Sequence, residues 1–129
     1  MCAMYLRRLS SRIAFFGVIR FSWKDYDEKK GGIGVPIVNV GFQVIPKTKE
    51  GNSYELVDKA IEVVSKSGVK YEVDPMETVM EGEYDKLMEI VKKAQEAVIA
   101  AGAQETMTFI KVHYRPEGVT IDEKVAKYR

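Results

Sequence analysis

The residues best suited to hold a small molecule are polar side chains at predicted strand positions. Asn39 and Gln43 lie on one side of a run that alternates with aliphatic residues, and their amides both donate and accept hydrogen bonds. Gly41 lies between them and would leave space above the sheet, because it has no side chain. This pattern predicts a shallow pocket for a neutral heteroaromatic ligand. A half-solvated sheet face is the alternative.

A second group of candidates lies in the stretch from Tyr71 to Gly82. The carboxylate of Glu81 could accept from an exocyclic amine or offset the positive charge of a ligand, or it could be a solvated acid at a strand end. Thr78 is the other polar residue of interest there. Met76, through its polarizable sulfur, and Tyr71 could pack against a flat ring, or both could be ordinary core residues.

These residue types do not combine into a catalytic site. Lys111 and His113 alternate with Phe109 on the last predicted strand, so the three should share one face. An acid–base set of Glu81, Lys111 and His113 would need all three within hydrogen-bond reach in a cleft. A solvated strand end is the simpler interpretation of His113. The sequence therefore favours a binding protein over an enzyme.

Composition excludes several other classes of function. The chain has 129 residues, the size of one domain, and a net charge of +1, which gives no electrostatic case for nucleic acid. Its single cysteine, Cys2, excludes an internal disulfide and a cysteine-based zinc cage, and its single histidine excludes a histidine-rich metal site. No apolar run approaches the ~18 residues of a membrane span. We expect a cytoplasmic protein without a cofactor.

Residues 1–34 differ in character from residues 35–129. The first part, Met1 to Lys24, contains arginine and lysine but no acidic residue, and a charged, glycine-rich linker follows. Three interpretations compete for this extension. It could be a targeting or membrane-surface segment, an arm that docks a partner or stabilises an oligomer, or the product of a mis-called start with true translation beginning near Val35.

Residues 35–129 predict strands and helices in the order β-α-β-β-α-β. Alternation marks the strands, and apolar residues at helical spacing mark the helices. Two capping boxes mark helix starts at Asn52 and Thr120, and Gly68 and Gly102 mark helix ends. The expected strands are Ile37–Ile45 ending at Pro46, Val69–Asp74, Met76–Gly82 and Thr106–Tyr114. The expected helices have buried faces of Tyr54, Val57, Ala60, Ile61 and Val64, and of Tyr84, Leu87, Met88, Val91, Ala94, Val98 and Ala101.

This order predicts an α+β, ferredoxin-like βαββαβ sandwich. Right-handed crossovers would place both long helices on one face of a four-stranded antiparallel sheet, and a short C-terminal helix would follow. The other face has no helix to cover it. We therefore expect Ile37, Ile45, Phe109 and Val79 to be exposed unless another subunit covers them, which favours an oligomer.

Five segments carry a resemblance to a known family. They are Val40–Pro46, Ser67–Glu72, Pro75–Gly82, Thr108–Val112 and Thr120–Val125. In their order and spacing, over about 90 residues from Pro36 onward, they resemble the small YkoF-like thiamine-binding family. The resemblance implies a ferredoxin-like domain that pairs sheet-to-sheet with further copies, as a dimer or tetramer. It also implies non-catalytic binding of thiamine or its hydroxymethylpyrimidine part, in vitamin supply or salvage.

The resemblance also ranks the candidate residues. Gln43, Met76, Thr78 and Glu81 fall at the family's motif positions, whereas Asn39 and Tyr71 are chosen mainly by geometry. Glu77 departs from the small residue expected there, and its carboxylate would narrow the pocket or favour a cation such as the thiazolium of thiamine. A regulatory or structural oligomer that binds another small molecule or an anion is the alternative function.

Overall fold

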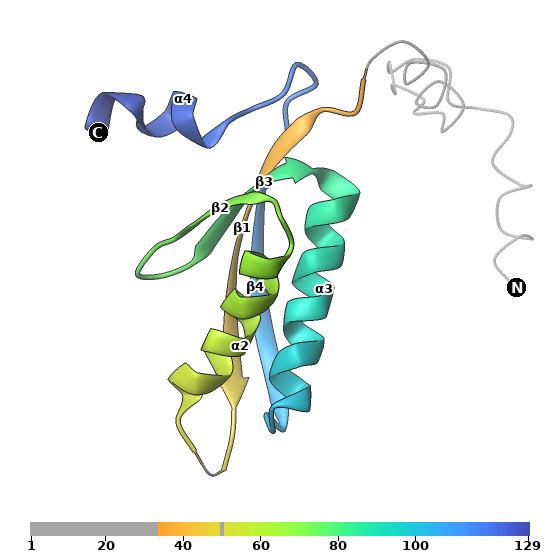
Figure 1. Cartoon of the computed structure of the whole chain (residues 1–129), viewed down its shortest axis with the longest axis vertical. Helices are drawn as coiled ribbons and strands as arrows, with labels where there is room; N and C mark the ends of the chain where they lie inside the picture. The colour runs from red at the N-terminus through yellow and green to blue at the C-terminus, as the bar shows by residue number, and fades with distance from the viewer. Residues whose placement is uncertain (1–33, 50) are drawn as a thin grey trace, which may run out of the picture. The chain divides into compact units, whose positions relative to one another are not determined.

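The computed structural model of the chain describes residues 34–49 and 51–129 (Figure 1). The predicted N-terminal extension, apart from Gly34, lies outside these residues, so its three interpretations stay predictions. The described elements, in chain order, are β1 (Ile37–Lys47), α2 (Ser53–Lys66), β2 (Lys70–Val73), β3 (Thr78–Glu83), α3 (Tyr84–Ala100), β4 (Glu105–His113), α4 (Ile121–Val125) and a 3₁₀ turn, η1 (Ala126–Tyr128).

The four strands form one sheet in the order β2-β3-β1-β4, with every neighbouring pair antiparallel. This order arises because each βαβ unit crosses over an intervening position in the sheet, which the partner unit then fills. Helices α2 and α3 pack against each other and against the same face of the sheet (Figure 1). The predicted ferredoxin-like α+β fold is confirmed.

The hydrophobic core lies between α2, α3 and one face of the sheet. On β1 the side chains of Val38, Val40, Phe42 and Val44 all point into it and are at most 7% exposed. Because side chains alternate along a strand, the residues between them face the other way. The helices contribute Leu56, Ala60 and Val64 from α2, and Leu87, Ile90, Val91, Ala94 and Val98 from α3.

Local signals in the sequence place the helix ends as expected. The Asn52 side chain accepts a hydrogen bond from the Tyr54 amide at 3.0 Å, and Thr120 accepts from the Glu123 amide at 3.2 Å. Gly68 has φ +75°, a conformation that few residues other than glycine adopt. Six of the residues predicted for the buried helix faces are buried, namely Ala60, Val64, Leu87, Val91, Ala94 and Val98. The prediction was wrong for Tyr54 and Tyr84, which are exposed in the first turns, and it missed Leu56 and Ile90, which are buried.

Pro46 lies inside β1, whereas the sequence predicted that the strand would end before it. The Lys47 carbonyl accepts from the Gln104 amide and so points toward β4. Backbone groups alternate in direction along a strand, so the Pro46 nitrogen points to the opposite side. There the pairing with β3 ends at Phe42 and Thr78. Next to Pro46, β3 therefore has no carbonyl group that would need the N–H that proline lacks.

We call the sheet face turned away from α2 and α3 the open face. Ile37, Ile45 and Phe109 lie on it and are 38%, 43% and 54% exposed, which confirms the expectation for these residues. The register also places Lys111 and His113 on this face, in line with Phe109, as predicted. The open face therefore offers both polar and apolar groups.

Candidate functional site

Four polar side chains form a row across the open face, one from each strand. Lys70 pairs with Glu81, Glu81 with Asn39, and Asn39 with His113 in the register of the sheet. Paired residues on neighbouring strands project from the same face, with Cβ atoms about 5 Å apart. Asn39 and Glu81 are thus brought together, as a shared site requires.

Gln43 lies on the same face, further along β1, opposite Phe109. Met76 lies in the turn between β2 and β3 and is 73% exposed. The open face and this turn therefore account for four of the six predicted ligand-binding residues, namely Asn39, Gln43, Met76 and Glu81.

Thr78 and Tyr71 lie on the other face of the sheet. Thr78 pairs with Phe42 and Tyr71 with Met80, and both partners belong to the core under the helices. Thr78 is only 6% exposed, and Tyr71 packs against the core. The physical reason is the two-residue period of a strand, which turns Thr78 and Glu81 to opposite faces because they are three residues apart. Within one chain they cannot contact one ligand together.

The space above Gly41 is filled, contrary to the interpretation made from the sequence. A Cβ atom at position 41 would lie 2.9 Å from Oε2 of Glu77, so the Glu77 carboxylate covers the glycine. The other carboxylate oxygen, Oε1, accepts from the Lys111 ammonium at 2.6 Å. Gly41 lets a charged side chain lie close to the backbone of β1, and the centre of the open face carries an ion pair.

The C-terminal segment covers the end of the open face at which β1 begins. We call residues 119–129 the strap. The Val119 amide donates to the Ile37 carbonyl at 2.9 Å, and Val119 and Ile121 are 0% and 4% exposed. Neither residue belongs to the core under the helices, so both are buried on the open-face side. Figure 1 shows α4 beyond this end of the sheet.

The strap engages two of the predicted ligand-binding residues. The Ile121 amide donates to Oε2 of Glu81 at 2.6 Å, and Nδ2 of Asn39 donates to the Val119 carbonyl at 3.4 Å. Oδ1 of Asn39 is buried without a hydrogen-bond partner. Sequence reasoning missed this role of the strap, although the apolar residues on either side of the Thr120 cap were a signal that the helix start would be buried.

Two ion pairs on the rim hold the outer part of the strap. Lys70 lies 2.5 Å from Asp122, and Arg129 binds Glu72 through two hydrogen bonds of 2.6 and 2.8 Å. The hydrogen bond from the Arg129 guanidinium lowers the pKa of Glu72, and the hydrogen bond to Asp122 raises the pKa of Lys70. Both pairs are exposed to solvent and so bind weakly.

The acid–base set that the sequence left open is not assembled. Glu81 and His113 are separated by the whole of β1, because both pair with Asn39 from opposite sides. Two strand spacings amount to about 10 Å, well beyond hydrogen-bond reach. Lys111 is bound to Glu77 instead.

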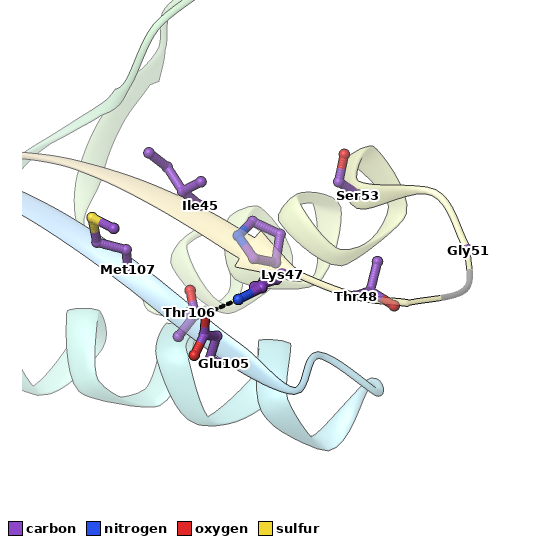
Figure 2. A pocket seen from close by; sticks show the side chains of 9 residues that line it. Ile45, Lys47, Thr48, Gly51, Ser53, Glu105, Thr106 and Met107 are labelled. Carbon is purple, nitrogen blue, oxygen red and sulfur yellow. Dashed lines mark ion pairs between the residues drawn. The ribbon is translucent and has the colours of Figure 1, made fainter.

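An open hollow of about 740 Å³ lies at the opposite end of the sheet (Figure 2). Ile45 and Met107 border it on the sheet side, and Ser53 borders it at the start of α2. Figure 2 shows the pair between Lys47 and Glu105, which are 2.9 Å apart. The hollow contains none of the six predicted ligand-binding residues, and the charged groups among its described lining residues, Lys47 and Glu105, neutralise each other.

Two further observations concern the described residues alone. Across residues 34–49 and 51–129, there is no cluster of three or more histidine, cysteine, aspartate or glutamate residues that could hold a metal ion. In the same part of the chain, no helix has both the length and the apolar character needed to cross a bilayer.

Comparison with known proteins identifies the family. The family model described as thiamine-binding protein matches residues 40–129, which include the strap and all of the open face except Ile37 and Asn39. The chain belongs to this family of thiamine-binding proteins. A UPF0045 protein of Clostridium perfringens is 52% identical over 91 residues, which cover 70% of this chain and 96% of that protein. A UPF0045 protein of Mycobacterium bovis is 42% identical over 92 residues, covering 69% of this chain and 88% of the relative.

Solved structures of family relatives support the fold. A Bacillus cereus domain of unknown function, DUF77, matches with a TM-score of 0.71 and 58% identity, covering 73% of this chain and 91% of that one. A Thermotoga maritima protein, provisionally assigned to thiamine biosynthesis or salvage, matches with a TM-score of 0.68 and 38% identity, covering 73% of this chain and all of that one. The family description and the name of the Thermotoga maritima protein mention thiamine, whereas the UPF0045 and DUF77 names state no function. None of these names states a catalytic activity.

Proposed function

We propose that the open face binds thiamine or its hydroxymethylpyrimidine part, without catalysis, in the supply or salvage of the vitamin. The observation that carries the proposal is the direct pairing of Asn39 with Glu81 on the open face of a chain from a thiamine-binding family. An amide beside a carboxylate offers both donors and acceptors, as recognition of an aminopyrimidine requires. The Thermotoga maritima relative supports the same metabolic context.

Each proposed ligand-binding residue has a distinct part. Glu81 accepts from the exocyclic amine, and Asn39 pairs with the adjoining edge of the pyrimidine ring. Gln43 lies on the same face and adds a further amide. Met76 offers a polarizable sulfur to a flat ring, and Glu77 offers a carboxylate to the thiazolium cation.

The absence of catalysis in this proposal follows from the separation of the titratable groups. Glu81 and His113 lie on opposite sides of β1, and Lys111 is paired with Glu77. No nucleophile with an adjacent base is present on the open face among the described residues. A bound vitamin would therefore be held and released unchanged.

We also propose that the protein works as a homo-oligomer, a dimer or a tetramer, packed sheet-to-sheet. Ile45, Met107 and Phe109 form an exposed apolar band on the open face, at the end that the strap leaves uncovered. Burial of such a band against a second copy is favourable by about 25 cal/mol per Å² of apolar surface. The same band supports the alternative function, a regulatory or structural oligomer that binds another small molecule or an anion.

Calorimetric titration of thiamine into the full chain tests the proposed function. We expect saturable heat, and a Glu81→Gln variant should bind a cationic ligand less tightly by at most about 1.5–3 kcal/mol. No heat at millimolar thiamine or hydroxymethylpyrimidine would refute the proposal. A thermal-shift screen over vitamins, nucleotides and amino acids then decides for the alternative, because a ligand that binds the folded state raises the melting temperature.

A further inference from the structure

The backbone of the strap presents to Asn39 and Glu81 a pattern that matches one edge of an aminopyrimidine. The Val119 carbonyl accepts from Asn39, and the Ile121 N–H donates to Glu81. An aminopyrimidine likewise carries an acceptor, the ring nitrogen, beside a donor, the exocyclic amine. The strap therefore satisfies these two side chains with the same kinds of groups that such a ligand would bring.

The strap satisfies the pair incompletely. Oδ1 of Asn39 has no partner, although Asn39 is only 4% exposed, and a buried acceptor without a donor is costly. An amine has two N–H donors, whereas a backbone amide has one. A ligand amine can donate to Glu81 and to Oδ1 of Asn39 while the ring nitrogen accepts from Nδ2, the bidentate pattern by which asparagine pairs with adenine.

We propose that the strap is an intramolecular competitor of the ligand. The strap occupies the position of the aminopyrimidine and must move away before a ligand binds there. This inference rests on the proposed function of the open face. It assigns to residues 119–129 an inhibitory role, and it names the recognised group as a ring nitrogen adjacent to an exocyclic amine. The thiazolium part of thiamine is not needed for this competition.

The attachments of the strap allow it to move as a unit. Its outer part is held by the exposed pairs of Lys70 with Asp122 and of Glu72 with Arg129, which contribute little in solvent. Its inner part is held by the burial of Val119 and Ile121. Opening therefore exposes two aliphatic side chains, so the closed form is favoured and the apparent affinity for a ligand is reduced by the fraction of open chains.

Hydrogen exchange of the Ile121 amide, with and without saturating thiamine, distinguishes a strap that the ligand displaces from a strap that stays closed over the ligand. Competition requires that bound thiamine release the strap, so exchange of the Ile121 amide should become faster. A strap that closes over the ligand would make exchange slower, and that result would overturn the inference. The amide of Val40, in the middle of β1, serves as the internal reference.

Weakening the outer attachments tests the inference without a substitution at Asn39 or Glu81, the pair that binds the ligand. In an Asp122→Asn, Arg129→Gln double variant of the full chain, both rim ion pairs are lost. We expect thiamine affinity to rise by about two- to tenfold, since each exposed pair changes the equilibrium between closed and open strap by at most about fivefold. A Glu89→Gln variant loses an exposed pair of 2.7 Å on α3 and should leave the affinity unchanged.

The outcomes distinguish this inference from the proposed function. Higher thiamine affinity of the double variant, together with faster exchange of the Ile121 amide when thiamine is bound, supports competition by the strap. Equal thiamine affinity of wild type and double variant refutes competition by the strap and leaves the proposed function intact. No binding of thiamine or hydroxymethylpyrimidine to either chain overturns both. A chain that ends at Gly118 would lose the burial of Val119 and Ile121 and with it part of its stability, so the double variant decides.

Discussion

Glu77 covers Gly41 with its carboxylate, so that a Cβ atom at position 41 would lie 2.9 Å from Oε2. Gly41 lies in β1 and Glu77 lies directly before β3, the neighbouring strand, and the two meet at the centre of the open face. The space above the glycine is thus occupied by an acidic side chain and is not free for a ligand. Because Lys111 neutralises this acid at 2.6 Å and is itself exposed, a cationic ligand can take the place of the lysine.

A Glu77→Gln variant should discriminate between the two candidate ligands. Thiamine carries the thiazolium cation, and hydroxymethylpyrimidine does not. We expect the variant to bind thiamine about 3- to 30-fold less tightly, with little change for hydroxymethylpyrimidine, because only the cation loses a charged partner. Parallel calorimetric titrations measure the two affinities.

Glu105→Gln is the matched control for this prediction. Glu105 pairs with Lys47 across the same two strands that carry Gly41 and Lys111, but at the other end of the sheet. It should alter neither affinity. An equal loss of affinity for both ligands in Glu77→Gln would show that the carboxylate does not act on the cation.

An Asn39→Val variant should separate stability from binding. Valine suits a central strand, and the substitution removes a buried amide that has one unpaired acceptor and one long hydrogen bond. We expect the free energy of unfolding to stay within about 1 kcal/mol of wild type or to rise. Thiamine affinity should fall by at least about tenfold, because a bidentate pair is lost.

Chemical denaturation and calorimetry check both halves of that expectation. Thr78→Val is the comparison, since Thr78 is equally buried but lies on the face under the helices. Its thiamine affinity should match wild type. Loss of thiamine binding in Thr78→Val, with binding retained in Asn39→Val, would place the site on the sheet face under the helices and contradict a site on the open face.

A Phe109→Ser variant should weaken the oligomer. Phe109 is 54% exposed in a single chain, so its removal costs the folded monomer little, whereas the proposed sheet-to-sheet contact loses an aromatic anchor. Light scattering after size-exclusion chromatography should show a smaller assembly at the same concentration. Tyr54→Ser, at an exposed position on α2, should leave the mass unchanged. A wild-type chain that elutes as a monomer would contradict the oligomer itself.

The ion pair between Arg129 and Glu72 should weaken at acidic pH. The hydrogen bond from the Arg129 guanidinium lowers the pKa of Glu72 below its ordinary value of 4.5. A carboxyl group with a lowered folded-state pKa adds stability that is present above the unfolded pKa and is lost as the pH falls through the folded value. This rim contact should therefore be intact at neutral pH and weaken below pH 4.5.

An NMR titration of the Glu72 carboxyl carbon measures this effect. In Arg129→Gln the pKa of Glu72 should move upward, toward the ordinary range. Arg115→Gln is the control, because Arg115 binds Glu123 and not Glu72. An unchanged titration of Glu72 in Arg129→Gln would mean that the pair is not populated in solution.

Much of the fold was predictable because its signals are local. Alternation along β1 assigned Val38 and Val40 to the core, and the caps at Asn52 and Thr120 are made by side chains within three residues of the groups they bind. The position of Pro46 was not predictable in this way. Its place inside β1 depends on where β3 stops pairing, which is a property of the neighbouring strand.

The candidate site was predictable only in part, and the reason is again the range of the interactions. The sequence correctly indicated that Asn39 and Gln43 share one sheet face. It grouped Thr78 with Glu81 by proximity along the chain, although the period of a strand turns them apart. It also left Gly41 open, because the residue that covers it, Glu77, comes from the turn between β2 and β3.

The sequence by itself determined the order of the elements, the family and the face to which each strand residue of β1 turns, because all three depend on residue types at short spacing. Only the tertiary structure decided what meets Gly41, Asn39 and Glu81. Glu77 reaches Gly41 from 36 positions away, and Ile121 reaches Glu81 from 40 positions away. Such contacts depend on which strands become neighbours and on the path of the chain, and both bring together residues that are far apart in the sequence.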